Sequence, residues 1–203
     1  MAYGQKWEVS PFAGYWRLKN SSMGSLNQDQ SVALDSDVRV KGDGYSYGVR
    51  LTWNTRGYYG QEIAYMRYRM NVRADRIPVL SSDGTSVVYI SQEGQANVDT
   101  IFYDFLAYFM PAGERWRPYF AGGAQVSRYG IPKIPYWTGG SSRNLGFNYG
   151  IGLKLRIAPH TLVRFDLRDY IGGRPYTLTI SDPANVSGHL RSLEGSLGLG
   201  IAW

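Results

Sequence analysis

The stretch GSLGLGIAW, residues 195–203, decides the fold class of this 203-residue chain. Its apolar side chains alternate with glycine, serine and alanine up to the last residue, at Leu197, Leu199, Ile201 and Trp203. A period of two indicates a β-strand with one apolar face. Most domains end in a polar tail that frays, so a strand that runs to a terminal tryptophan requires its own explanation.

The same alternation recurs upstream of this stretch. It is clearest at residues 45–54, 146–158 and 162–170. Less regular versions occupy residues 7–17, 61–72, 98–110 and 119–129. Pro11 leaves the register of the first of these open, because proline suits an edge or a bulge. Together with the terminal stretch, the pattern predicts an all-β chain of eight strands, each about ten residues long.

The composition agrees with strands and turns. The chain has 17 Tyr, 6 Trp and 25 Gly, which favour pleated surfaces and tight bends. It has no cysteine and only two histidines, His160 and His189, so we expect neither a metal nor a cofactor. The net charge of +6 does not gather into a basic stripe with stacked aromatics, so nucleic acid is not an expected partner.

The connections between the predicted strands alternate between short and long. The short ones carry turn residues and lie at 55–60, 111–118 and 159–161. The long ones lie at 18–44, 73–97, 130–145 and 171–190. This alternation predicts an antiparallel up-and-down sheet with the short turns and both termini at one end. Residues 1–203 are expected to form one domain and a monomer.

An antiparallel sheet with one apolar face fits two kinds of protein. In a soluble, lipocalin-like carrier the apolar face points inward, whereas in a membrane barrel it faces lipid. The polar faces carry single charges in mid-strand among small residues, which suits the narrow interior of an eight-stranded barrel. We therefore predict a lumen charge network of Arg50, Arg67, Arg69, Asp104, Lys154, Arg156, Arg164, Asp166, Arg168 and Glu194. Because Arg67 and Arg69 are placed in the lumen, the alternation within residues 61–72 predicts that the opposite face points outward. That face consists of Ala64, Met66, Tyr68, Met70 and Val72.

Large aromatic residues lie where the apolar faces end. One predicted interface girdle adjoins the short turns and termini and consists of Trp7, Trp53, Phe109, Trp116 and Trp203. A second adjoins the long links and consists of Tyr45, Tyr129, Phe147 and Tyr170. Amphipathic rings favour both membrane interfaces. The fold expected from these features is a closed, eight-stranded, antiparallel, up-and-down transmembrane β-barrel.

With these features in place, the chain resembles the small eight-stranded outer-membrane β-barrels related to the transmembrane domain of outer-membrane protein A. The resemblance is carried by the terminal stretch and by the segments PFAGYW (11–16), RPYFAGGAQ (117–125) and RFDLRDY (164–170). It implies a place in the outer membrane of a Gram-negative cell envelope, as a mature chain whose signal peptide has been removed. It also implies that the assembly machinery reads Leu199, Ile201 and Trp203, with tryptophan in place of the more usual phenylalanine.

The first functional hypothesis is a structural or surface-binding protein without enzymatic activity. Its long loops would meet an extracellular ligand or protein, and outward arginines and lysines near them would hold the phosphates of lipopolysaccharide. A narrow channel for ions or small solutes remains an alternative, although a plug of salt bridges is favoured over an ion path. The loop at 128–137 could either bind a partner or rest Tyr136 and Trp137 on lipid headgroups.

A lipid A-modifying enzyme is a further alternative. His189 lies near Ser187, Ser192 and Glu194, a set of residue types found in hydrolases. In an extended strand, however, His189 and Ser192 point to opposite sides, and Ser187 falls in a predicted loop. No catalytic residue is therefore assigned.

Overall fold

The computed structural model describes residues 6–18, 21–24, 37–82, 84–135, 137, 140–176, 178 and 188–203. The strands within these ranges are β1 (Trp7–Leu18), β2 (Ser21–Gly24), β3 (Asp37–Lys41), β4 (Asp43–Arg56), β5 (Tyr59–Leu80), β6 (Val87–Tyr108), β7 (Trp116–Tyr129), β8 (Ser142–Ala158), β9 (Thr161–Gly173) and β10 (His189–Ala202). In this described part of the chain, no helix is long and apolar enough to cross a membrane.

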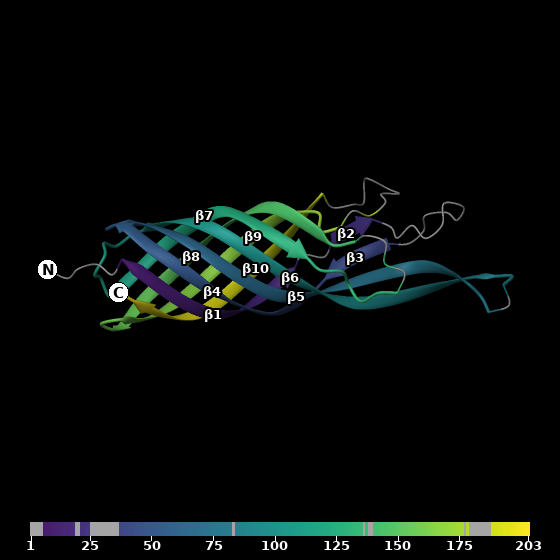
Figure 1. Cartoon of the computed structure of the whole chain (residues 1–203), viewed down its shortest axis with the longest axis horizontal. Coiled ribbons are helices and arrows are strands. Elements are labelled where there is room, and N and C mark those ends of the chain that lie inside the picture. Colours follow the sequence, from purple (N-terminus) through teal and green to yellow (C-terminus); the bar gives the residue numbers. More distant parts are fainter. Residues whose placement is uncertain are drawn as a thin grey trace.

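Eight of the strands close into a barrel (Figure 1). Each pairs antiparallel with its neighbours in the ring β1–β4–β5–β6–β7–β8–β9–β10. The first and last strands complete the ring through pairs such as Val9 with Ile201. The short turns at 57–58, 109–115 and 159–160 lie at the same end as both ends of the described chain. The predicted up-and-down barrel is therefore confirmed.

Beyond the barrel, two strands continue as a long hairpin at the opposite, long-loop end (Figure 1). β6 pairs with β7 only as far as Val98, yet its pairing with β5 runs on to Val87 and Leu80. β3 pairs with β5 along this extension, and β2 pairs with β3. The prediction of a loop at 73–97 is wrong, because most of these residues form strands. The link at 18–44 likewise contains β2 and β3, while residues 25–36 and 179–187 lie outside the described residues.

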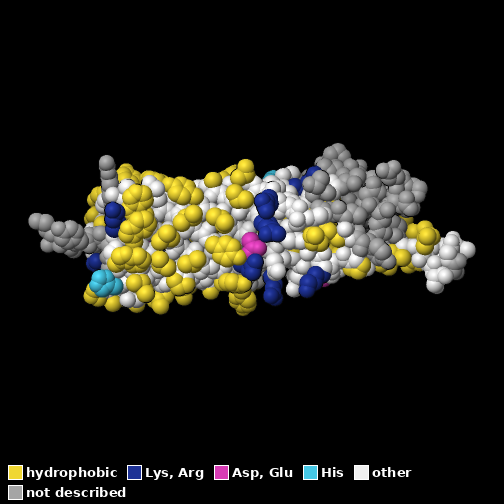
Figure 2. Space-filling view, in the orientation of Figure 1, with side chains coloured by type: hydrophobic (Ala, Val, Ile, Leu, Met, Phe, Trp, Pro, Cys, Tyr) yellow, Lys and Arg dark blue, Asp and Glu magenta, His cyan; other side chains and the backbone are white. Residues whose placement is uncertain are grey.

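The barrel exposes its apolar face and buries its charges. Tyr47 and Phe165 are exposed outward, whereas Arg50, Lys154 and Asp166 are buried inside. Figure 2 shows the outward hydrophobic side chains as a band across the face of the barrel in view. This arrangement excludes the lipocalin-like alternative, in which the apolar face would form the interior. The order of apolar and polar faces follows the membrane-barrel pattern.

The interior changes character along the barrel axis. Its middle and short-turn end hold most of the charged groups, and its long-loop end holds an apolar cluster that includes Trp16, Met66, Tyr68, Met70, Val72, Val98 and Phe102. The prediction that Ala64, Met66, Tyr68, Met70 and Val72 face outward is wrong, since all five are buried. At this height the inward face of β5 is apolar and the outward face carries Arg67 and Arg69, which reverses the order in the rest of the barrel. Alternation alone therefore assigned the two faces the wrong way round.

Residues above β7 and β9 cover the apolar cluster. The Tyr176 hydroxyl donates to the Gly130 carbonyl oxygen over 2.7 Å, and burial raises the pKa of this phenol. The Trp137 ring lies against Tyr176 with ring centroids 4.8 Å apart. Trp137 therefore packs against the cap of the barrel, while Tyr136 lies outside the described residues.

The second predicted girdle is only half outward. Tyr45 and Phe147 are exposed, but Tyr129 and Tyr170 are buried in the interior. The two buried rings sit in the apolar cluster, where the Tyr170 hydroxyl reaches the Glu194 carboxylate over 2.8 Å. The prediction that Tyr129 and Tyr170 lie at a membrane interface is wrong.

Candidate functional site

A compact network of charges crosses the middle of the lumen. β9 supplies Arg164, Asp166 and Arg168, because alternate residues of RFDLRDY point inward. β4 supplies Arg50 and β5 supplies Glu62. All five side chains are 0% exposed.

Each charge in this central network has an opposite charge beside it. Arg164 holds Glu62 through both ends of its guanidinium, with Nη2 3.0 Å from Oε1, and donates from Nε to Asp166 over 2.7 Å. Arg168 reaches Glu62 over 3.1 Å and also pairs with Asp104. The Arg50 guanidinium lies 3.4 Å from Asp166 and stacks over the Phe12 ring, 3.6 Å from its centroid.

The three arginines of the network balance three carboxylates: Arg50, Arg164 and Arg168 against Glu62, Asp104 and Asp166. Buried ions are tolerated only when paired and hydrogen-bonded. The balance of charges meets the first condition, whereas Nε and Nη1 of Arg50 have ion-pair contacts but no hydrogen-bond partner. A cavity on the short-turn side of the network measures about 30 Å³, and one on its long-loop side about 10 Å³. Cavities of that size hold a water or two, so neither forms a wide path past the network.

A second polar group lies toward the short-turn end. Lys154 pairs with Glu8 and donates to the Tyr108 hydroxyl over 2.8 Å. Asn54 donates to the other Glu8 oxygen over 2.8 Å. Arg117 stacks over Tyr108, 3.7 Å from the ring centroid. Toward the long loops, Glu194 instead accepts hydrogen bonds from Ser46 and Tyr170.

Two of the residues predicted for the lumen lie outside it. Arg67 faces outward with 42% of its side chain exposed, and its Nε donates to Asp99 over 2.6 Å. Arg69, two residues on, is also exposed. Both predictions are wrong for the same reason as the prediction for the apolar residues of β5. The inward face of this strand is the one that carries Glu62 and Met66. Arg156 lies on the inward face of β8 at the barrel mouth and donates to the Gly113 carbonyl oxygen.

The sequence pattern did not identify several interior polar residues, among them Glu8, Asn54, Glu62 and Arg117. The first two belong to strand ends, where alternation is short. Glu62 stands opposite Thr52 on β4 and Asp104 on β6. The registers of both strand pairs were needed to place it inside.

The residues predicted for the aromatic girdle lie outward near the short turns. Trp7 and Trp53 stack with ring centroids 5.6 Å apart, and Phe109, Trp116 and Trp203 are exposed. At the C-terminus, Leu199 and Ile201 also face outward. The Trp203 backbone pairs with that of Trp7, which fixes the terminal residue to the first strand.

Outward arginines gather at the other edge of the hydrophobic band, where Figure 2 shows dark blue side chains beside it. We call this set the arginine belt: Arg17, Arg67, Arg69, Arg128, Arg143 and Arg191. One row of paired positions runs across four strands from Arg67 through Asp99 and Arg128 to Arg143. Arg191 pairs with Asp169, whereas Arg128 and Arg143 stand directly opposite each other.

Among the described residues no metal site forms, and His189 and Ser192 do not come together as a hydrolase pair. No group of histidines and carboxylates there could hold a metal ion. His189 and Ser192 lie on opposite faces of β10, with His189 exposed and Ser192 buried. Ser187 lies outside the described residues. A nucleophile and a base must lie within hydrogen-bond reach of each other, so His189 and Ser192 do not form such a pair.

Comparison of the structure with solved proteins finds small outer-membrane barrels. OprG from Pseudomonas aeruginosa superposes with a TM-score of 0.63 at 12% identity, covering 100% of this chain and 99% of its own. Neisserial surface protein A gives 0.56 at 14% identity, covering 97% of each chain. The N-terminal barrel of Pseudomonas aeruginosa OprF gives 0.54 at 14%, covering 99% and 100%. No protein-family model matches the sequence, and no curated protein is similar to it in sequence.

Proposed function

Because the chain has the fold of the small outer-membrane β-barrels, we propose that it resides in an outer membrane with a structural and surface-binding role. The observation that carries this proposal is the central network, in which Glu62, Arg164 and Arg168 cross the lumen without exposed side-chain surface. A barrel sealed by paired charges acts through its outer surfaces.

Lipopolysaccharide is the lipid partner that the arginine belt favours. The belt borders the hydrophobic band on the long-loop side, at the height expected for headgroup phosphates. Like charges directly opposite each other on paired strands destabilise a sheet, and Arg128 and Arg143 are such a pair. A phosphate between them would replace this repulsion with charge-assisted hydrogen bonds.

The proposed binding surface for an extracellular partner is the extension formed by β2, β3 and the distal parts of β5 and β6. Its tip carries exposed apolar side chains at Leu80, Val87, Val88 and Tyr89. These residues lie beyond the arginine belt and so outside the lipid band. A protruding hairpin with an apolar tip is suited to contact another macromolecule.

Conductance in planar bilayers tests the sealed lumen. The purified barrel is expected to give no reproducible current steps, because the interior cavities near the network hold only a water or two. A deliberately opened variant, Arg164→Ala with Glu62→Ala, serves as the positive control for insertion. Defined steps from the unaltered protein would instead establish the channel alternative.

Binding by intact cells tests the extension. Replacing residues 75–91 with Asn-Gly joins the paired residues Ala74 and Gln92 through a two-residue turn and removes the tip. Cells that display this shortened variant are expected to lose adhesion to matrix proteins or polysaccharides that the full chain supports. A heat-modifiable gel shift verifies that the shortened barrel has folded. Equal adhesion by both chains would refute the role of the hairpin.

Retention of lipopolysaccharide tests the belt. The double variant Arg128→Gln with Arg143→Gln is expected to co-purify with less lipopolysaccharide than the unaltered chain in mild detergent. Arg115→Gln is the control, because Arg115 is exposed at the short-turn end, away from the belt. It removes one charge where the double variant removes two, so the same loss per removed charge would mean that overall charge, and not position in the belt, causes the effect.

A further inference from the structure

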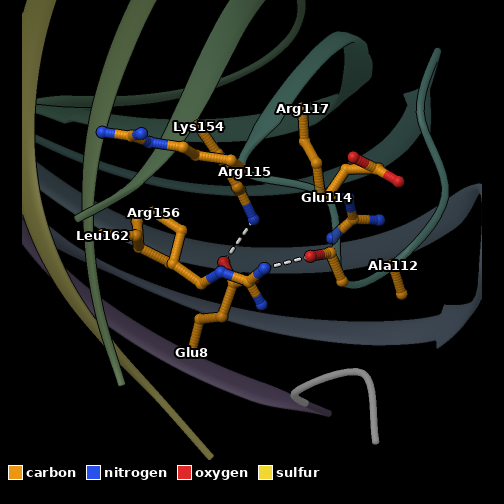
Figure 3. A pocket seen from close by; sticks show the side chains of 9 residues that line it. Glu8, Ala112, Glu114, Arg115, Arg117, Lys154, Arg156 and Leu162 are labelled. Carbon is orange, nitrogen blue, oxygen red and sulfur yellow. Dashed lines mark hydrogen bonds and ion pairs between the residues drawn. The ribbon is translucent and has the colours of Figure 1, made fainter. Parts of the chain in front are cut away.

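A small cavity opens at the mouth of the barrel on the short-turn side. It measures about 30 Å³, and its lining includes Glu8, Gly113, Arg117, Lys154 and Arg156. Figure 3 shows the cationic ends of Arg117, Lys154 and Arg156 turned toward the same space. They arrive from two adjacent strands, β7 and β8, in which Arg117 is paired with Lys154.

The charges around this cavity do not balance. Glu8 is already the partner of Lys154, and it also accepts a hydrogen bond from Asn54. The other lining carboxylate, Glu114, forms no ion pair with either arginine in the described structure. Arg117 and Arg156 therefore face the cavity without a carboxylate of their own among the described residues, and the exposed Arg115 adds a third arginine to the lining.

Arg117 is the more demanding of the two because it is 92% buried, with only 8% of its surface exposed. Its Nη2 donates to the Gly57 carbonyl oxygen over 3.1 Å, and its Nη1 lies 3.4 Å from the Asn54 amide oxygen. Its Nε has no hydrogen-bond partner. The Arg156 guanidinium donates to the Gly113 carbonyl oxygen. These neutral acceptors solvate the two cations but do not neutralise them.

We propose that this mouth cavity binds a small monovalent anion of halide size between Arg117 and Arg156. Burial of an unpaired charge is costly, and two like charges at close range repel each other. One anion removes both penalties. The cavity has space for about one or two waters, which fits a chloride ion and not a nucleotide or a lipid headgroup. The central network closes the lumen above the site, so the anion binds without passing through.

Chloride-dependent stability tests the site. Unfolding in detergent is followed in urea, because guanidinium chloride would itself supply chloride. Sodium chloride replaces sodium gluconate at constant ionic strength. Chloride at a hundred times its dissociation constant is expected to lower the unfolding equilibrium constant about a hundredfold, and the constant should keep falling in proportion to chloride above that dissociation constant. Arg117→Gln and Arg156→Gln are expected to abolish this dependence. Arg143→Gln, the same change at an exposed outward position, is expected to retain it.

Chloride-35 NMR provides a readout that does not depend on unfolding. The folded protein is expected to broaden the chloride line, and excess bromide should reverse the broadening. If Arg117→Gln does not fold, loss of broadening in Arg156→Gln carries the test. Identical stability in chloride and gluconate, or broadening that survives Arg156→Gln unchanged, overturns the proposal. Conductance plays no part in either measurement, so the result is separate from the proposed function.

Discussion

At the scale of single residues, Glu62 is the acceptor on which the central network depends. It binds Arg164 through both oxygens and also accepts from Arg168 and Thr52. Removing one partner of a buried ion pair leaves a buried charge without compensation. The network is therefore more sensitive to the loss of one member than its balanced total charge implies.

The substitution Glu62→Gln is expected to lower the free energy of unfolding by about 3–5 kcal/mol, since the buried Arg50, Arg164 and Arg168 lose an anion that they share. Urea titration in detergent micelles measures this change. The control is Asp99→Asn, which breaks the exposed pair with Arg67 and should alter stability little. A similar decrease in the free energy of unfolding for both variants would show that burial of the ion pair does not increase the cost of breaking it.

The sequence identified single residues only where alternation was strict. In RFDLRDY the polar and apolar residues separate cleanly, so the inward positions of Arg164, Asp166 and Arg168 could be predicted. In β5 the inward face changes from Glu62 to Met66 and Met70 over a few residues. A charge on the outward face then resembles a charge on the inward face, which is why Arg67 and Arg69 were misplaced.

At the scale of strands, glycine sets how closely neighbours approach. A Cβ built on Gly123 of β7 would meet the Tyr103 carbonyl oxygen and lie 2.7 Å from the Asp104 Cα, both on β6. Backbone atoms cannot move aside as a flexible side chain can. Gly195 on β10 has open space at the same position.

Gly123→Ala is therefore expected to impair folding of the barrel, whereas Gly195→Ala should be tolerated. The folded fraction after refolding into detergent, read from the gel mobility of unheated samples, distinguishes the two. The folded fraction should be clearly lower for Gly123→Ala and unchanged for Gly195→Ala. Equal refolding would mean that β6 and β7 can separate without cost.

The last strand ends on Trp203, which could serve as a membrane-interface anchor, as an assembly signal, or as both. A comparison with Trp116 separates these two roles. Trp116 and Trp203 are exposed to a similar extent, 59% and 56%, near the same end of the barrel. If the assembly machinery reads the final residue, Trp203→Ala lowers the amount assembled in cells more than Trp116→Ala does. Refolding of both purified variants in detergent should remain equal. Equal assembly in cells would leave Trp203 as an anchor only.

Strand pairing explains why the hairpin of β5 and β6 was not predicted. The segment at 73–97 contains Pro78 and the polar run SSDGTS, which favour a loop. In the structure the polar run is the turn itself, and flanking residues pair as Val79 with Val88 and Leu80 with Val87. These pairs depend on a register that neither segment shows alone.

At the scale of the whole molecule, the hydrophobic band separates two kinds of exposed apolar residue. Ile151 on β8 is 51% exposed within the band, and Leu80 at the hairpin tip is 70% exposed beyond the arginine belt. Only the first is expected to meet acyl chains. The overall architecture could be predicted because this band, the turn lengths and the terminal strand all point to the same barrel.

Ile151→Arg is expected to destabilise the barrel in lipid vesicles by about 2–4 kcal/mol, the cost of arginine near a bilayer midplane. Leu80→Arg makes the same chemical change and is expected to have little effect, because water surrounds the tip. Urea or guanidinium unfolding in vesicles measures both. A larger cost at Leu80 would mean that the hairpin, and not the barrel wall, contacts the hydrocarbon.

The distance between the tryptophan residues at the short-turn end and the arginine belt sets the bilayer thickness that matches this protein. Along β1, Trp7 and Arg17 are separated by about ten residue steps, or about 33 Å of strand. With the usual tilt of barrel strands, this corresponds to a nonpolar height of about 25 Å. Membranes thicker than this would have to thin around the protein or bury its arginines. Hydrophobic mismatch would therefore favour its partition into thin membranes.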